Sequence, residues 1–259
     1  MLSTKVGRVL TPDPDFELPG ALWKGKLNMN YKYDYSAEGV RKSVEQSLHR
    51  LGLAYIDIVF IHDLSPDNPD FKEGDYEKYF EQAKNGAMPE LTKMREEGLI
   101  KGWGLGVNTT RPILETIEVA DPDIFLSAKQ YSMLVHEDDL NNVFPVCENE
   151  GISLVIGAAL NAGFLAGKER YNYGGTIPEE MKEKRAKLQK VADKHNVDLR
   201  TAALQFSAAP DVVASVIPGA SNGEQSEANA KSMDVKIPKA FWKELKSKGL
   251  IAENAPEPK

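Results

Sequence analysis

The sequence predicts an α/β fold in which helices alternate with parallel strands. Three observations support this fold class: strand-like apolar runs alternate with helical stretches, no internal repeat or low-complexity linker interrupts them, and Tyr55–Asp63 is apolar enough for a buried parallel strand. Strands are predicted over residues 2–6, 55–62, 102–107, 124–131, 152–158 and 212–217. A complete TIM (β/α)₈ barrel has eight parallel strands, so two are missing. We therefore expect one domain over residues 1–259, a TIM barrel that lacks its first two βα units and keeps six parallel strands.

The first half of the chain gives each element a start and an end. Leu2–Val6 is a short apolar run that ends at Gly7, so the chain opens inside a strand and we expect it to be N-terminally truncated. Thr11–Tyr35 contains prolines, glycines and aromatic residues, which predicts a long loop. Ser36 is a good N-cap for an amphipathic helix, and Gly52 is a good end for it.

The second half of the chain continues the alternation. A helical stretch from Tyr76 is interrupted at Gly86 and restarts with Pro89 in its first turn. Val212–Ile217 is the last strand, and the turn Pro218–Gly223 leads from it into another helix. Further helices are predicted over residues 112–120, 140–150, 178–194, 199–208 and 239–250.

Composition narrows the class of protein. The chain has 41% apolar residues and a net charge of −7 without a Lys/Arg-rich block, so we expect a globular protein with no nucleic-acid or membrane partner. Cys147 is its one cysteine, and the start lacks a signal-peptide pattern, which favours a cytoplasmic protein. No metal-binding or serine-nucleophile motif occurs. His136 stands in an acidic loop, where we expect a solvated side chain rather than a metal ligand.

Two side chains at predicted strand ends could take part in chemistry. His62 ends the central strand, and an imidazole there can polarise a carbonyl or move a proton because its ordinary pKa lies near neutrality. Lys5 ends the first strand, and its positive charge could lower the pKa of a neighbouring acid. A satisfied structural histidine and an ordinary solvated lysine would give the same pattern.

The turn after the last strand is a candidate phosphate site. Gly219–Gly223 precedes a helix, and the first N–H groups of a helix can bind a phosphate. Between Gly219 and Ala230 there is no Lys or Arg, whereas Glu224 and Glu227 are present, and an acid near the ribose disfavours a 2′-phosphate. A dinucleotide bound here would therefore be NAD rather than NADP. A plain capped turn, or a site for a phosphorylated metabolite, fits the same residues.

Small residues also follow the fifth predicted strand. The segment Gly157–Gly167 is rich in glycine and alanine. Such residues let a backbone approach a bulky ligand closely, although close packing of a helix on a strand would give the same composition. We take the segment as a second candidate for ligand contact.

Three segments together resemble the aldo-keto reductases: Leu2–Arg8, Ile56–Asp63 and Ile217–Ser221. The likeness covers essentially the whole chain. It points to the branch of the D-threo-aldose 1-dehydrogenases, which includes L-fucose, L-galactose and pyridoxal 4-dehydrogenase-like members. Phe241–Leu250, near the end of the chain, is also similar to that branch. The resemblance implies a barrel that transfers hydride between nicotinamide C4 and a carbonyl or hemiacetal carbon.

The resemblance also implies site residues. Lys5 and His62 match the lysine and histidine of the family's catalytic tetrad, whereas its Asp and Tyr belong to the two βα units that are absent. Tyr31, Tyr33 or Tyr35 could replace the tyrosine as proton donor, but aromatic packing in a loop explains them as well. The residues that match the cofactor site are Asn108, Gly157, Leu160, Asn161, Gly163, Gly219, Ala220, Ser221, Asn222, Gln225 and Asn229.

The resemblance implies a nicotinamide-dependent oxidoreductase without a metal, and the acids after the last strand favour NAD over NADP. We expect it to oxidise a sugar or aldehyde, namely an aldose such as L-fucose, L-galactose or D-arabinose, which becomes its lactone. The alternative is a catalytically impaired truncated barrel that binds nucleotide or completes a partner subunit. A barrel short of two strands has open edges, so we also expect low stability or self-association.

Overall fold

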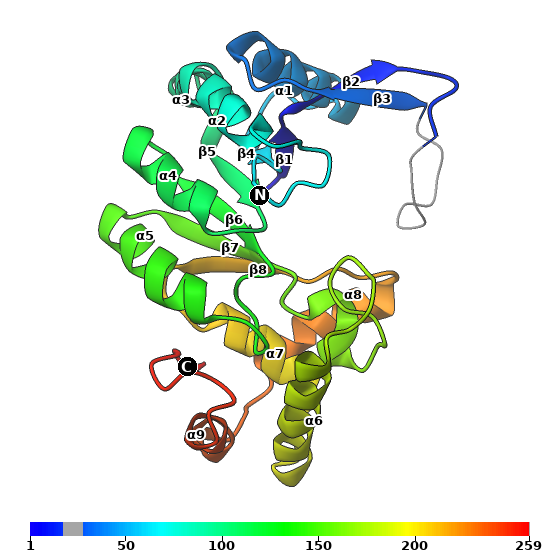
Figure 1. Cartoon of the computed structure of the whole chain (residues 1–259), viewed down its shortest axis with the longest axis vertical. Coiled ribbons are helices and arrows are strands. Elements are labelled where there is room, and N and C mark those ends of the chain that lie inside the picture. The colour runs from blue at the N-terminus through cyan, green and yellow to red at the C-terminus, as the bar shows by residue number, and fades with distance from the viewer. Residues whose placement is uncertain (18–27, 259) are drawn as a thin grey trace. The chain divides into compact units, whose positions relative to one another are not determined.

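The computed structural model describes residues 1–17 and 28–258 (Figure 1). They form two compact units, which are described separately. The first contains the described part of Met1–Gly106 together with Glu115–Asp123, and the second contains Val107–Leu114 and the chain from Ile124 onward. One domain over residues 1–259 stays a prediction.

The first unit contains three parallel strands. They are β1 (Ser3–Val6), β4 (Ile56–His62) and β5 (Ile100–Val107), and β4 pairs with both others. The apolar side chains of β4 are buried, as its composition predicts. Gly102 of β5 is a packing requirement, because a Cβ there would lie 3.1 Å from the Cβ of Asp123.

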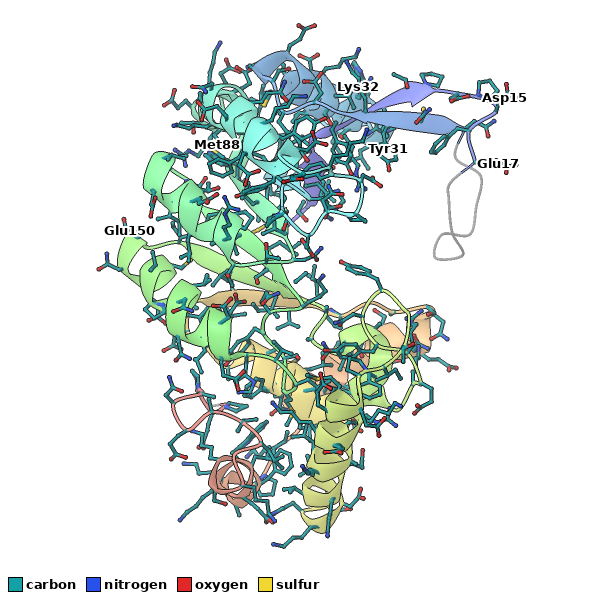
Figure 2. All side chains as sticks on the ribbon, in the orientation of Figure 1. Asp15, Glu17, Tyr31, Lys32, Met88 and Glu150 are labelled. Carbon is teal, nitrogen blue, oxygen red and sulfur yellow. The ribbon has the colours of Figure 1, made fainter. Side chains whose placement is uncertain are left out.

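A hairpin replaces much of the loop expected at Thr11–Tyr35. The strands β2 (Arg8–Pro12) and β3 (Met29–Tyr33) pair antiparallel. The predicted loop was therefore wrong at residues 11–12 and 29–33, whereas residues 13–17 have no regular structure, as predicted. Residues 18–27 lie outside the described residues. The missed signal was the alternation in β3, where Tyr31 and Lys32 project to opposite sides of the strand (Figure 2). Figure 1 shows the hairpin beside the helix that follows it.

The helices of the first unit begin and end near the predicted residues. Helix α1 (Ala37–Leu51) has Ser36 as its N-cap and ends at left-handed Gly52. Helices α2 (Asp75–Asn85) and α3 (Ala87–Glu96) are separated at Gly86, where a Cβ would lie 2.8 Å from the backbone nitrogen of Ala37. Helix α4 (Arg111–Val119) follows β5 and is divided between the units, since residues 115–119 belong to the first and residues 111–114 to the second.

The second unit has its own three parallel strands. They are β6 (Ile124–Ala128), β7 (Ser153–Gly157) and β8 (Val213–Ile217), with β7 between the other two. Strand β6 ends earlier than predicted because the backbone of Lys129 is left-handed, with φ at 70°. Both units together hold the six predicted parallel strands.

Helices cover these strands and close the core of the second unit. They are η1 (Asp139–Val143, a π-helical turn), α5 (Phe144–Glu150), α6 (Glu179–Lys194), α7 (Leu199–Ala208), α8 (Gly223–Lys231), the short η3 (Ser232–Asp234) and α9 (Lys239–Ser247). His136 is fully buried, so its predicted place in a solvated loop was wrong. Its ring packs against Phe206 of α7, with ring centroids 5.2 Å apart. No helix among the described residues has the length and apolar character to cross a membrane.

Candidate functional site

Lys5 and His62 lie on neighbouring strands of the first unit. Lys5 of β1 is in register with Phe60 of β4, and His62 is two residues farther along the same strand. Because side chains alternate along a strand, Lys5 and His62 share one face of the sheet at its C-terminal edge. Lys5 is exposed, whereas 28% of the His62 side chain is exposed. The two predicted catalytic residues are thus brought together.

Electrostatics keep His62 neutral. Burial, followed by the positive charges of Arg8 and Lys5, lowers the pKa of His62 to about 3. A neutral imidazole can donate one hydrogen bond and accept another. At physiological pH, His62 can therefore hold a hydroxyl or carbonyl oxygen by a hydrogen bond.

Arg8 is the residue of this site that the sequence interpretation missed. Its Nη2 atom donates to Asp63 Oδ2 at 2.8 Å and to the Tyr33 hydroxyl at 2.9 Å. Asp63 Oδ2 lies 3.4 Å from Nε2 of His62, so the guanidinium reaches the histidine through one carboxylate. Arg8 Nε is buried without a hydrogen-bond partner among the described residues. The available signal was the place of Arg8 at the start of a strand three residues after Lys5.

The three candidate tyrosines are not tuned as proton donors. The Tyr35 hydroxyl donates to the backbone oxygen of His62 at 3.0 Å, and burial raises its pKa. Burial also raises the pKa of Tyr33 to about 12. The pKa of Tyr31 is raised by burial and by its hydrogen bond to Asp70. A proton donor near neutral pH needs a lowered pKa, so these contacts favour the packing interpretation.

A cavity of ≈ 380 Å³ lies beside Lys5. Hydroxyl groups and cations dominate its lining, which consists of Ser3, Thr4, Lys5, Arg8, Leu10, Ser43, Ser47 and Arg50. No carboxylate lines it among the residues that the structure describes. Such a surface suits a ligand rich in hydroxyl groups or one that carries negative charge.

In the second unit, the segment after β7 has an unusual backbone. Ala158, Asn161 and Ala162 have left-handed φ angles of 60°, 46° and 62°. Asn161 begins the short helix η2 (Asn161–Ala166) and is fully buried. Its Nδ2 atom donates to Asn172 Oδ1 at 3.1 Å, whereas its own Oδ1 has no partner among the described residues. A buried acceptor without a partner fits a hydrogen-bond donor of a bound cofactor.

Glycine is required at two positions of this segment for different reasons. A Cβ at Gly157 would lie 3.2 Å from the Cβ of Ala128, so close strand packing explains this residue. Gly163 has φ at 91°, and a Cβ there would lie 2.7 Å from Cδ of Lys168. The amide of Gly163 donates to the Leu160 oxygen at 2.9 Å, which closes the turn.

Asn108, which directly follows β5, has polar neighbours on both its groups. Its backbone oxygen accepts a hydrogen bond from Nε2 of Gln130 at 2.5 Å. Its side-chain Oδ1 accepts one from the Tyr173 hydroxyl at 3.0 Å. The Lys129 ammonium lies 5.1 Å from the centre of the Tyr173 ring. The sequence interpretation named Asn108. It did not name Gln130 and Tyr173, which contact Asn108, or Lys129, which contacts the Tyr173 ring.

The turn after β8 is exposed and internally capped. Gly219, Ala220, Ser221 and Asn222 are all exposed. Asn222 Oδ1 accepts a hydrogen bond from the Gln225 amide, and Gln225 Oε1 accepts one from the Ser221 amide, both at 2.9 Å. The structure thus brings Ser221, Asn222 and Gln225 together as a cap for α8.

A cation from another helix reaches the far end of this region. Nη1 of Arg200, on α7, donates to Oδ1 of buried Asn229 at 3.3 Å. Arg200 Nε also lies 3.4 Å from Asp198 Oδ2. The sequence between Gly219 and Ala230 lacks a basic residue, but Arg200 of α7 brings a positive charge next to it.

Groups that could hold a metal ion are absent from residues 1–17 and 28–258. Cys147 is buried, and burial raises the pKa of its thiol to about 12. A thiol with so high a pKa is a poor nucleophile or ligand at neutral pH.

Comparison with known proteins extends these observations. The model of the Aldo/keto reductase family matches residues 1–249. A pyridoxal 4-dehydrogenase from Microbacterium luteolum is 33% identical over 97% of this chain and 76% of its own length. A D-threo-aldose 1-dehydrogenase from a Pseudomonas species is 30% identical over 97% of this chain and 75% of its own length.

Solved structures agree on the fold. An aldo-keto reductase from Bacillus halodurans in its holo form superimposes with a TM-score of 0.69 at 23% identity. The match covers 99% of this chain and 76% of that protein. The six parallel strands and their helices are therefore those of an aldo-keto reductase barrel.

Proposed function

Because the chain belongs to the aldo/keto reductase family of nicotinamide-dependent oxidoreductases, we propose that it oxidises an aldose to its lactone with NAD. The candidate sugar substrates are L-fucose, L-galactose and D-arabinose. Pyridoxal is a further candidate substrate because one relative is named for it. The observation that carries the proposal is the pair Lys5 and His62 on one face of β1 and β4.

The residues of the first unit account for half of the chemistry. Oxidation of a hemiacetal would remove a hydride from C1, which a bound nicotinamide would accept, and a proton from the C1 hydroxyl. Neutral His62 holds this hydroxyl by a hydrogen bond. The Lys5 ammonium stabilises negative charge that develops on the oxygen, which favours loss of the proton. Lys5 is exposed, so the proton leaves to solvent beside it.

The residues of the second unit are those that would hold the cofactor. Asn108 offers an amide to the carboxamide, and the segment around Asn161 offers a buried acceptor. The turn that carries Ser221 and Asn222 would meet the adenosine half. Preference for NAD is supported by the acids in α8 and by the lack of Lys or Arg in the turn itself.

A second candidate function is cofactor binding without turnover, or the completion of a partner subunit. It is favoured by the three tyrosines, because none has its pKa lowered towards neutrality. An exposed apolar strand residue supports self-association as part of this alternative, because Ile217 of β8 keeps 48% of its surface exposed. Light scattering over a range of protein concentrations tests it. We also propose a cytoplasmic location, because the buried, unpaired Cys147 suits a reducing compartment.

The test is NAD reduction followed at 340 nm with each sugar, with pyridoxal and with a sugar phosphate. We expect His62→Phe and Lys5→Met each to lower the rate about 100-fold or more. Lys42→Met is the matched control, because Lys42 is an exposed lysine of α1 away from the cavity.

The outcomes separate the functions. Sugar oxidation that survives both substitutions at the rate of the control would overturn the assignment of the pair. NADH binding without oxidation of any substrate would establish the second candidate. Turnover of the sugar phosphate alone would replace free aldoses with an anionic substrate, in keeping with the cations around the cavity.

A further inference from the structure

The segment that follows β7 is held in a conformation its residues do not favour. Ala158, Asn161 and Ala162 adopt left-handed backbone angles, which a Cβ atom disfavours. Such a conformation persists only where surrounding contacts fix it. The contacts that fix this segment therefore control the position of Asn161, the predicted cofactor ligand with the unpartnered buried oxygen.

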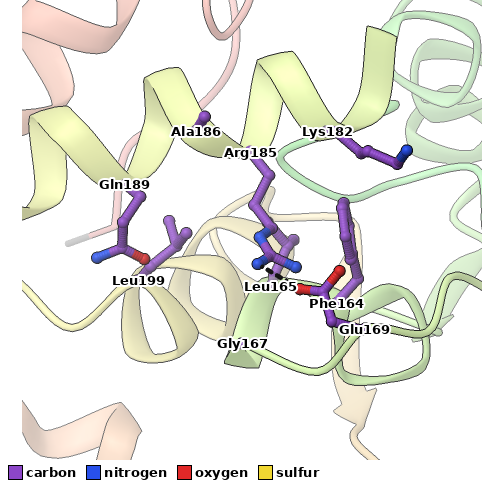
Figure 3. Close-up of a pocket in the computed structure, with 9 residues that line it drawn as sticks. All are labelled: Phe164, Leu165, Gly167, Glu169, Lys182, Arg185, Ala186, Gln189 and Leu199. Carbon is purple, nitrogen blue, oxygen red and sulfur yellow. Dashed lines mark hydrogen bonds and ion pairs between the residues drawn. The ribbon is translucent and has the colours of Figure 1, made fainter. Parts of the chain in front are cut away.

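Packing alone does not fix the segment against α6. A cavity of ≈ 350 Å³ lies between them, lined on one side by Phe164, Leu165, Gly167 and Glu169 and on the other by residues of α6 (Figure 3). A cavity leaves its walls without contact across it. The side chains that reach across the gap must do this work instead.

Arg185 of α6 reaches across it with three contacts. Its guanidinium lies 4.3 Å from the centre of the Phe164 ring. Nη1 donates to the Lys168 backbone oxygen at 3.3 Å, and Nη2 pairs with Glu169 at 2.8 Å, the contact drawn as a dashed line in Figure 3. One planar side chain thus contacts a ring, a carbonyl and a carboxylate of the same segment.

These contacts lead directly to the predicted ligand residues. The amide of Lys168 donates to the Gly163 oxygen at 3.0 Å, and the amide of Gly163 donates to the Leu160 oxygen at 2.9 Å. Arg185 is therefore joined to Leu160 through two backbone hydrogen bonds. Phe164, under the guanidinium, belongs to the same short helix as Asn161.

We propose that Arg185 is a positioning residue, which holds the Leu160–Lys168 segment in its cofactor-binding conformation without touching the cofactor. The proposal rests on the proposed function only in naming a nicotinamide dinucleotide as the ligand. Arg170 also contacts the segment, since its Nε and Nη2 atoms donate to the Ala162 backbone oxygen at 3.2 and 3.1 Å. Arg185 is the one of the two that anchors the segment to a long helix.

Lys182 provides a matched control on the same helix. It lines the same cavity one turn before Arg185, but its ammonium pairs with Glu179 of α6 itself, at 2.9 Å. Removing Lys182 therefore removes a similar charge from the cavity without loosening the segment. Arg185→Lys is the conservative variant, because a lysine can still donate to a carbonyl or carboxylate but cannot form the planar stack on Phe164.

Two measurements on the full chain test the proposal. The first is amide hydrogen exchange over residues 160–168, for which Arg185→Gln should exchange about five to ten times faster than wild type and Lys182→Gln should not change. The second is the Kd for NADH from its fluorescence, which Arg185→Gln should raise about fivefold to tenfold, with partial recovery in Arg185→Lys. The urea midpoint should change little, because Glu169, the partner of Arg185, is exposed and a pair with an exposed partner adds little stability.

Each result has one meaning. Unchanged exchange in Arg185→Gln overturns the positioning role whatever NADH does. Faster exchange with an unchanged Kd for NADH overturns it too, because the segment would then move without consequence for binding. If wild type binds no NADH, the proposed function fails, and the exchange data still decide whether Arg185 holds the segment.

Discussion

Replacing His136 with phenylalanine tests what holds the end of the chain on the second unit. The backbone amide of Ala252 donates to Nε2 of His136 at 3.0 Å, so that nitrogen must be an acceptor and the ring must be neutral. The other nitrogen, Nδ1, then donates to the Ser132 oxygen at 3.0 Å. Phenylalanine keeps the ring that packs on Phe206 and removes both hydrogen bonds.

The cost follows from the groups left behind. His136 is fully buried, so its loss leaves one backbone N–H and one backbone C=O without a partner in the interior. Each such group costs about 1–3 kcal/mol. We therefore expect the free energy of unfolding to fall by about 2–6 kcal/mol at pH 7.5. His49→Phe is the control, because His49 is exposed on α1 and should change stability by less than about 0.5 kcal/mol.

The pH dependence gives the prediction its sign. Burial, with a further contribution from Lys184, lowers the pKa of His136, and Glu137 opposes this only partly. The unfolded chain binds a proton as the pH falls below the ordinary value of about 6.5, whereas the folded chain binds it only at a lower pH. Stability that is complete well above pH 6.5 is therefore lost on acidification, and the loss between pH 7.5 and pH 5.5 is at most about 1.4 kcal/mol. The variant lacks this loss.

Urea unfolding at pH 7.5 and pH 5.5, followed by circular dichroism, makes the measurement. The difference in unfolding free energy between wild type and His136→Phe should be smaller at pH 5.5 than at pH 7.5, by at most about 1.4 kcal/mol. Asp139 also titrates in this range, because burial raises its pKa to about 7, but it is present in both proteins and cancels in the difference. A difference that stays constant with pH would refute the buried, neutral state of His136.

Three further predictions concern other groups. Tyr35→Phe removes the hydrogen bond to the His62 oxygen and should lower the free energy of unfolding by about 1 kcal/mol in urea titration, whereas no change would mean that water replaces the hydroxyl. Cys147 should resist iodoacetamide at pH 8 in the native protein and react in denaturant, as intact mass would show, because burial raises its pKa to about 12. Arg200→Gln should weaken NADP binding about threefold to tenfold more than NAD binding, measured by fluorescence; equal effects would remove Arg200 from cofactor selection.

The fold could be predicted because each strand is bounded by residues that stop it. The apolar run of β4 and the glycine at position 52 before it need no information from distant parts of the chain. The hairpin was not predicted, because the aromatic residues Tyr31 and Tyr33 suggest a loop cluster. They nevertheless alternate with Lys32 as a strand requires. Local sequence patterns thus predict most helices and strands. Whether a segment forms a loop or an edge strand depends on a partner strand from another part of the chain.

The candidate site divides in the same way. Lys5 and His62 could be found because their strands end there, and strand ends are visible in the sequence. Arg8 could not, because its contacts are Asp63 and Tyr33, which are 55 and 25 residues away. The charge that helps to keep His62 neutral is therefore a product of pairing between strands, not of sequence proximity.

Cofactor preference shows how far a local charge count can be trusted. The acids Glu224 and Glu227 favour NAD in the sequence, but Arg200 from α7 adds a cation beside Asn229. This cation is not free to meet a 2′-phosphate at full strength, since Asp198 lies 3.4 Å from it. Lys231 is likewise paired with Glu227, at 2.5 Å. The neighbourhood thus has three acids against two paired bases, and a 2′-phosphate would enter a field that is negative on balance. The proposed preference for NAD therefore rests on how these charges are paired in space, and not on the sequence count alone.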